Sequence, residues 1–295
     1  MATITDLLAN IIELSGPCPN ICDETVLLGG SGGTEVVSII TGEPVTPYPP
    51  LNIPSGSGST STGSSESIVT DGLFMRLDAT NYTSGLWLDE TVNGNNAFIS
   101  GATWVSTNGG IFDLDGINDT IVVTHNSSLS LSTTQQRTMQ VWVNFDALPT
   151  PTNRMIVAGK LSSNFAFDGY WFATDSSGNV VSATNGGGTS KTVVSGASIT
   201  TGTWYLYTFI SQITGAANTT KVYLNDTQYI NNFHGNDTYS ESNNLVLGYL
   251  PLPLVGVTGI SYLNGKIGAV YFYTRGLTTG EITTNFNATK SKYGL

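Results

Sequence analysis

Four oxygen-bearing side chains lie close together in the segment FDLDGINDTIVV: Asp113, Asp115, Asn118 and Asp119. A calcium ion (Ca2+) takes about six to eight oxygen ligands, which carboxylates, amide oxygens and loop carbonyls supply. The same side chains also close turns, because Asp and Asn accept hydrogen bonds from nearby backbone N–H groups. We expect a hairpin turn and no cofactor, with a calcium site as the alternative.

Catalytic residues are not spaced as an enzyme would need them. Glycoside hydrolysis uses two carboxylates about 5 to 10 Å apart, and none of the eight glutamates has such a partner within a predicted strand. Gly29, Ser31 and Gly33 match the G-x-S-x-G pattern of a nucleophile elbow. No helix former follows them, and no sequence cue links His125 or His234 to Ser31. We therefore expect a protein without enzymatic activity.

Aromatic side chains are the other candidate binding groups. Trp142 and Trp204 lie within apolar stretches, so they are expected in the core. Tyr170 and Trp171 are expected at the surface, where their rings could stack on a sugar ring. These two residues are the candidate glycan-binding residues.

Contacts with other proteins are predicted in two segments. Residues 249–262 contain no charge, so they pack on a neighbour or expose an apolar patch. We favour a contact with a sister subunit or another protein through Leu250, Leu252 and Leu254 over a glycan site. Near the N-terminus, helical spacing gives a short helix one apolar face: Ile4, Leu7, Leu8, Ile11 and Ile12. A helix this short is marginal alone, so its face must be buried on its own domain, a sister subunit or a foreign partner.

The rest of the N-terminal arm, residues 1–67, has the composition of a linker. A proline-rich stretch (42–54) favours extended geometry, and a Ser/Gly-rich stretch (55–67) follows it. Residues 1–71 carry eight carboxylates and no lysine or arginine. This charge is either solvated or suited to a basic partner surface.

Neither nucleic acid nor a membrane is expected as a partner. The formal net charge is −11, whereas nucleic-acid phosphates are contacted through Lys and Arg. No stretch approaches the roughly 20 apolar residues of a membrane-spanning helix. The N-terminus has no basic segment and no small-residue cleavage site, so we expect no export signal.

From residue 68 onward, short β-branched and aromatic runs bounded by Gly, Asn, Asp and Ser predict strands. The predicted strands are Leu73–Leu77, Ala97–Ile99, Ile111–Leu114, Thr120–Val123, Thr138–Phe145, Arg154–Ala158, Tyr170–Ala173, Val180–Ala183, Thr203–Ser211, Lys221–Leu224, Gln228–Ile230, Leu245–Leu247 and Gly265–Tyr273. Thr278 and Glu281 have the spacing of a capping box, which predicts a short C-terminal helix. We predict an all-β fold, a two-sheet antiparallel jelly-roll sandwich over 68–295 with an extended N-terminal arm (1–67) and short terminal helices.

Several sequence blocks resemble laminin-G-like, concanavalin A-type jelly-roll domains. In order, they are GLFMRLDATNYTSG, LDETVNGNNAFISGATW, FDLDGINDTIVV, TMQVWVNF, TWYLYTF and KVYLND. The closing strand and helix of LNGKIGAVYFYTRGLTTGEITTNFNATKSKYG look most like the copies in bacteriophage virion proteins. Some members of this fold bind calcium, but the family's acidic pair after the glycine of the last strand is missing, since Ala269 and Val270 follow Gly268.

The resemblance implies a phage virion structural protein. We expect a capsid decoration (cement) protein whose arm binds other virion proteins, first of all the major capsid protein, while the sandwich projects as part of a homo-oligomer. A tail fibre or adhesin that binds a host-surface glycan is the alternative, followed by a free carbohydrate-binding module. In the virion reading, the protein is assembled in the host cytoplasm and ends at the particle surface.

Overall fold

The computed structural model describes residues 67–131, 135–161, 169–186, 189–214, 217–235, 242–250 and 259–295. The division into an arm and a sandwich therefore stays a prediction. The same holds for the partner-binding residues that lie outside the described ranges: Ile4, Leu7, Leu8, Ile11, Ile12, Leu252 and Leu254. Within the ranges described, no helix is long and apolar enough to cross a membrane.

The first of two antiparallel layers is built around β17 (Asn264–Tyr273). Two strands pair, one after the other, along the same edge of β17. β5 (Ile111–Asp115), itself paired with β4 (Thr103–Val105), takes the first half of that edge, and β1 takes the second. The layer runs in the order β2 (Leu86–Asp89), β1 (Leu73–Thr83), β17, β7 (Arg137–Phe145), β12 (Trp204–Thr214), β13 (Ala217–Leu224) and β14 (Thr227–Gly235).

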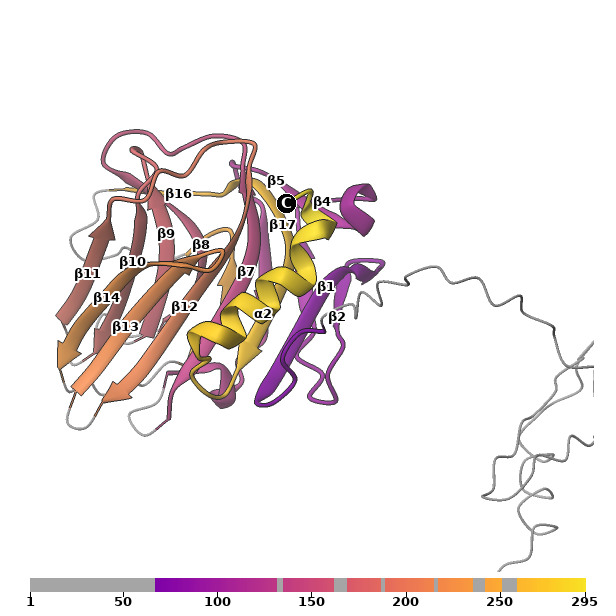
Figure 1. Ribbon diagram of the computed structural model, residues 1–295. Helices are drawn as coiled ribbons and strands as arrows, with labels where there is room; N and C mark the ends of the chain where they lie inside the picture. Colours follow the sequence, from indigo (N-terminus) through magenta and orange to yellow (C-terminus); the bar gives the residue numbers. More distant parts are fainter. Residues whose placement is uncertain are drawn as a thin grey trace, which may run out of the picture. The chain divides into compact units, whose positions relative to one another are not determined.

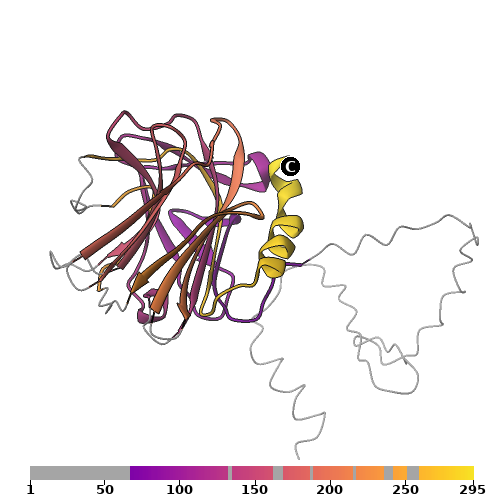
Figure 2. The ribbon, with the colours of Figure 1, turned by 60° about the vertical axis from the view of Figure 1, so that its left-hand side comes forward.

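The second layer runs in the order β3 (Ala97–Ser100), β6 (Thr120–Val123), β15 (Leu245–Leu247), β8 (Asn153–Leu161), β9 (Gly169–Asp175), β10 (Val180–Gly186) and β11 (Thr189–Ser195). β16 (Gly259–Ser261) joins β8 in parallel. β2 pairs with both β1 and β3, so it connects the layers on one side. Figures 1 and 2 show the two layers face to face, which confirms the predicted jelly-roll sandwich.

The main core lies between the layers. Phe172 of β9 stacks on Tyr207 and Phe209 of β12, with ring centroids 5.0 and 5.8 Å apart. Strand alternation sends every second residue inward, so β17 contributes Val270 and Phe272 to this core. The two layers are therefore joined by aromatic packing as well as by β2.

A second apolar cluster covers the outer face of the first layer. Tyr271 and Tyr273 of β17 and the predicted core residue Trp142 pack there beneath helix α2 (Thr279–Thr289) and the 3-10 turn η3 (Lys290–Tyr293). Figure 1 shows α2, in yellow, lying across this layer. The predicted capping box is confirmed, since Thr278 and Glu281 cap each other. Two further 3-10 turns are η1 (Thr107–Gly109) and η2 (Ser127–Leu129).

Candidate functional site

The four residues considered as calcium ligands lie at the turn between β5 and β6. Asp115 Oδ1 accepts the backbone N–H two residues on at 2.8 Å, and Asp119 Oδ2 accepts the N–H of Asp115 at 2.9 Å. Asp113 lies 3.9 Å from Lys266 Nζ, and Asn118 is exposed. Within the described ranges, no three His, Cys, Asp or Glu residues form a group that could hold a metal. The geometry supports the hairpin turn.

Tyr170 and Trp171, the candidate glycan-binding residues, are both 0% exposed. Tyr170 stacks on Phe209 with centroids 5.3 Å apart, and its hydroxyl donates to the carbonyl oxygen of Leu129 at 3.2 Å. Trp171 faces the other way and belongs to an apolar cluster with Leu250. The predicted surface position of this pair is wrong because both faces of β9 are covered, one by the first layer and the other by Leu250.

Leu250 was expected to contact another molecule, but its side chain is only 2% exposed. It lies over Gly159, where an added Cβ would be 2.8 Å from Leu250 Cδ1 and also from Trp171 Cβ. The glycine thus makes room for the leucine. The prediction for Leu250 is wrong, because this side chain is buried on its own sheet.

A hollow of about 340 Å³ opens where the β2–β3 loop meets the end of β6. We call it the asparagine hollow. Its lining contains four amides, one imidazole and one phenyl ring, and no described lining residue carries a carboxylate: Asn93, Gly94, Asn95, Asn96, Phe98, Val123, Thr124, His125 and Asn126. The Phe98 side chain is 57% exposed. The hollow therefore combines amide donors and acceptors with an open aromatic face.

Asp89 holds the β2–β3 loop in shape. Its Oδ1 accepts the backbone N–H groups of Arg76 and Thr91, both at 2.9 Å. Its Oδ2 accepts the backbone N–H of Asn95 at 2.8 Å, and its own N–H donates to Asn96 Oδ1 at 2.8 Å. Both carboxylate oxygens are used within the protein, so Asp89 orders the loop from behind the hollow.

Some amide atoms of the hollow form hydrogen bonds within the protein, and others do not. Asn95 is 7% exposed, and its Oδ1 accepts from Asn126 Nδ2 at 3.0 Å, which ties the loop to the segment after β6. The Asn96 amide uses its oxygen for Asp89, while its Nδ2 has no hydrogen-bond partner in the part of the chain that is described. The hollow thus has a fixed wall and at least one free donor.

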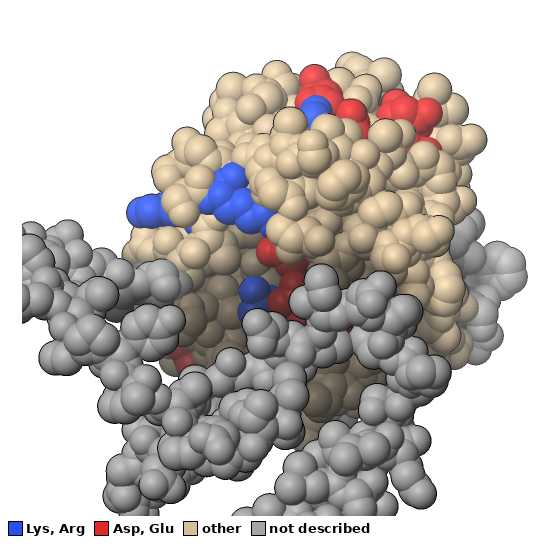
Figure 3. All heavy atoms as spheres, turned by 90° about the vertical axis from the view of Figure 1, so that its right-hand side faces the viewer, with Lys and Arg blue, Asp and Glu red and all other residues tan. Residues whose placement is uncertain are grey.

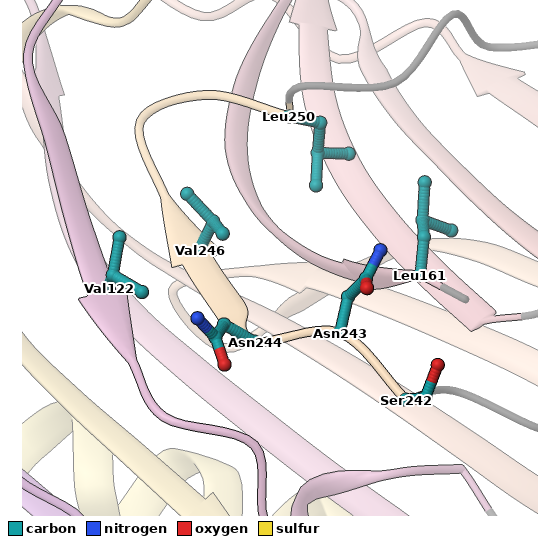
Figure 4. A pocket seen from close by; sticks show the side chains of 7 residues that line it. All are labelled: Val122, Leu161, Ser242, Asn243, Asn244, Val246 and Leu250. Carbon is teal, nitrogen blue, oxygen red and sulfur yellow. The ribbon is translucent and has the colours of Figure 1, made fainter. Parts of the chain in front are cut away.

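A second hollow, of about 390 Å³, adjoins the first along the outer face of the second layer. We call it the apolar hollow, and Figure 4 shows the side chains that line it: Val122, Leu161, Ser242, Asn243, Asn244, Val246 and Leu250. Val122 pairs with Phe98 on one side and with Val246 on the other. Asn244 Oδ1 accepts the backbone N–H of His125 at 2.9 Å, which connects the two hollows.

A charged cluster lies elsewhere, on the outer side of β1. Arg76 Nε is 2.9 Å from Glu90 Oε2, and Lys292 Nζ is 2.6 Å from Asp78 Oδ1. Burial raises the pKa of the Glu90 carboxyl. Burial also acts to raise the pKa of Asp78, but hydrogen bonds from Lys292 and Thr80 outweigh it, so the pKa of Asp78 is below its ordinary value. Figure 3, viewed from the side of β1 and β2, shows acidic and basic groups next to one another. Each of these four charged groups has a partner, which indicates a structural role.

Sequence reasoning did not single out Asn96, Phe98, His125 or Asn126 as binding residues. The available signal was the block NGNNAF, which we interpreted only as a family motif. His125 and Asn126 lie about 30 residues further along and meet this block only because β3 pairs with β6.

A family model described as "Concanavalin A-like lectin/glucanases superfamily" matches residues 114–283. No curated protein gives a significant match. The structural matches include Trypanosoma rangeli sialidase in complex with the inhibitor DANA, with a TM-score of 0.56, 14% identity, and coverage of 74% of this chain and 33% of the sialidase.

Two toxin structures are also similar. The binding domain of Paraclostridial Mosquitocidal Protein 1 has a TM-score of 0.55 and 16% identity over 74% of this chain and 52% of its own. A structure of botulinum neurotoxin type C, a toxin whose cell entry depends on interaction with two ganglioside molecules, has a TM-score of 0.56 and 14% identity over 74% of this chain and 51% of its own. This chain therefore spans about a third of the sialidase and about half of each toxin chain, and the likeness concerns the fold.

Proposed function

We propose that this chain, which belongs to the concanavalin A-like lectin/glucanases superfamily, binds carbohydrate, and that the asparagine hollow is the binding site. One observation carries the proposal: the same hollow contains several amide groups and the exposed ring of Phe98, and none of its described lining residues has a carboxylate. The volume of about 340 Å³ is within the range of small-molecule sites, roughly 300 to 1,000 Å³.

The chemistry of the lining suits an uncharged sugar. A sugar hydroxyl both donates and accepts, and an amide offers one acceptor oxygen and two donor hydrogens. The free Nδ2 of Asn96 can donate to such a hydroxyl while its oxygen keeps the bond from Asp89. The Phe98 ring offers an apolar face to the C–H side of a sugar ring. The described residues of the hollow contain no lysine, arginine or carboxylate, so we propose a neutral ligand.

We also propose that the protein binds glycan without cleaving it. Hydrolysis by the common mechanism needs two carboxyl groups on either side of the scissile bond. Glu90 and Asp89 are the acids that precede the hollow wall in the sequence. Glu90 pairs with Arg76, and both oxygens of Asp89 accept backbone N–H groups of the loop. The similar sialidase and toxin folds support a glycan as the class of ligand, since one is a sialidase in complex with the inhibitor DANA and the other a toxin that interacts with gangliosides.

Binding of the full-length protein to an array of neutral glycans tests the proposal. We expect at least one neutral glycan to bind, with affinity reduced about tenfold or more by Asn96→Ala or Phe98→Ala. Tyr229→Ala is the matched control, because Tyr229 is an exposed aromatic residue (40%) on β14, outside the hollow. An array without binding, or binding that these variants leave unchanged, would overturn the proposal.

As the biological setting, we propose the surface of a bacteriophage particle. This rests on the resemblance of the C-terminal segment NFNATKSKYG to phage virion proteins. Within that setting we now favour the tail fibre or adhesin over the decoration protein. The asparagine hollow offers an adhesin a binding site, whereas Leu250, one of the expected protein contacts, is buried on its own sheet.

A further inference from the structure

A buried lysine meets an exposed histidine at the edge of the asparagine hollow. Lys160 of β8 is 0% exposed, whereas His125 is exposed and lines the hollow. Lys160 Nζ lies 2.8 Å from His125 Nδ1 and 2.7 Å from the carbonyl oxygen of Asn243. The lysine therefore contacts the histidine from behind, on the side away from the solvent.

The chemistry of the two groups determines which histidine nitrogen carries the proton. A lysine ammonium has three donors and no acceptor, and a neutral imidazole has one donor and one acceptor nitrogen. Since Lys160 donates to Nδ1, that nitrogen must be the acceptor. The ring proton is then on Nε2, which has no hydrogen-bond partner among the described residues.

We propose that Lys160 is a positioning residue that holds His125 as the Nε2–H tautomer, so that this N–H donates to an oxygen of the bound ligand. The ligand part of the inference rests on the proposed function, whereas the tautomer is a property of the free protein. The hydrogen bond from the ammonium to Nδ1 is charge-assisted, and it polarises the ring so that the Nε2–H becomes a stronger donor. The group that His125 contacts must have an oxygen lone pair, as a sugar hydroxyl or carbonyl does.

The position of Lys160 supports a role beyond packing. It lies opposite Tyr170 across β8 and β9 and is 0% exposed, so its ammonium is removed from water. A buried ammonium is costly unless it is hydrogen-bonded, and an apolar side chain would fill the site without that penalty.

His125 is held at two points, which leaves its ring little freedom. Lys160 fixes the ring through Nδ1, and Asn244 Oδ1 fixes the backbone through the His125 N–H at 2.9 Å. Asn243 and Asn244 are adjacent, so Lys160 and His125 are both bonded to the same short segment before β15. The geometry makes this segment and Lys160 the support for a single donor.

The tautomer is measured on the free full-length protein by long-range ¹H–¹⁵N NMR at a pH where histidine is neutral. The chain has two histidines, so His234→Gln identifies the signals of His125. We expect the Nε2–H pattern in the wild type and a mixture of tautomers in Lys160→Met. An Nδ1–H pattern in the wild type, which needs no variant to fold, would overturn the inference, as would an unchanged pattern in a folded Lys160→Met protein.

Ligand binding provides the second readout, with the panel of neutral glycans as the probe. Lys160→Met should weaken binding about tenfold in the wild type and have no further effect in a His125→Ala background, because it acts through His125. Additive losses would contradict the positioning role. The expected tautomer in a protein that binds no glycan would contradict the proposed function alone, whereas glycan binding with the Nδ1–H tautomer would contradict this inference alone.

Discussion

Asp89 Oδ2 accepts the backbone N–H of Asn95 at 2.8 Å, so the wall of the asparagine hollow is shaped by a carboxylate that does not line it. Replacing Asp89 with alanine leaves the N–H groups of Arg76, Thr91 and Asn95 without this acceptor. Since a lost hydrogen bond to a charged group is worth about 1.5 to 3 kcal/mol, we expect Asp89→Ala to lower the free energy of unfolding by several kcal/mol and to abolish glycan binding.

The matched control for Asp89→Ala is Asp115→Ala, which removes a turn carboxylate outside the hollow. Because Asp115 is exposed and water can replace its hydrogen bond to the turn, the variant should destabilise the protein by only about 1 kcal/mol and leave binding unchanged. Urea unfolding and glycan titration measure the two effects. If Asp115→Ala also removed binding, the loss in Asp89→Ala would reflect general destabilisation.

Calcium removal should leave the protein unchanged. The carboxylates of Asp115 and Asp119 accept hydrogen bonds within their own turn. We therefore expect the same melting temperature with and without a chelator. A melting temperature that falls on chelation in the wild type, but not in Asp115→Ala, would instead establish a calcium site at residues 113–119.

The ion pair of Arg275 with Glu281 should make stability depend on acid pH. Hydrogen bonds from Arg275 lower the pKa of Glu281 from 4.5 to about 2. A lowered carboxyl pKa stabilises the fold above pH 4.5, and this contribution is lost as the pH falls from 4.5 to about 2. Because both side chains are partly exposed, at 27% and 29%, solvent screens the pair, and we expect it to contribute about 1 kcal/mol or less.

Glu281→Gln isolates this charge, since glutamine can still serve in the capping box. Urea unfolding should show a slightly less stable variant at neutral pH and equal stability of the two proteins near pH 2. If the two proteins differed in stability by the same amount at both pH values, the ion pair would not be the cause of that difference.

Leu250→Ala should destabilise the chain without changing its oligomeric state. The side chain is 2% exposed and packs over Gly159 and Trp171, and truncation of a buried leucine costs about 2 to 5 kcal/mol. Val194→Ala, at an apolar residue that is 47% exposed, is the control and should have little effect. Urea unfolding and light scattering check this. A change in oligomer mass with unchanged stability would restore the intermolecular contact expected from the sequence.

Phage particles that lack this protein distinguish the two virion roles. If the protein is an adhesin, the particles should resist heat and osmotic shock as before but adsorb poorly to host cells. Complementation with Phe98→Ala protein should restore its presence on the particle and not adsorption. Particles that lose heat resistance and still adsorb would support the decoration role.

Much of the fold followed from local sequence. Each predicted strand overlaps a strand of the structure, and Thr120–Val123 coincides with β6. Strands can be predicted locally because consecutive residues of a strand point alternately to its two faces. The capping box at Thr278 is likewise a local pattern. β2, β4, β11 and β16 were not predicted. Three of them are only three or four residues long, so pairing with neighbours rather than their own pattern defines them.

The candidate site depended on tertiary structure. The sequence alone placed Tyr170 and Trp171 in a strand, but both side chains became buried because each face of β9 is covered. Phe98 was part of a family motif, and its register opposite Val122 placed its ring on the outer face. Lys160 and His125 are 35 residues apart. Alternation along a strand states which residues share a face, whereas only the pairing of strands and the packing of loops decide which face is covered and which distant side chains meet there.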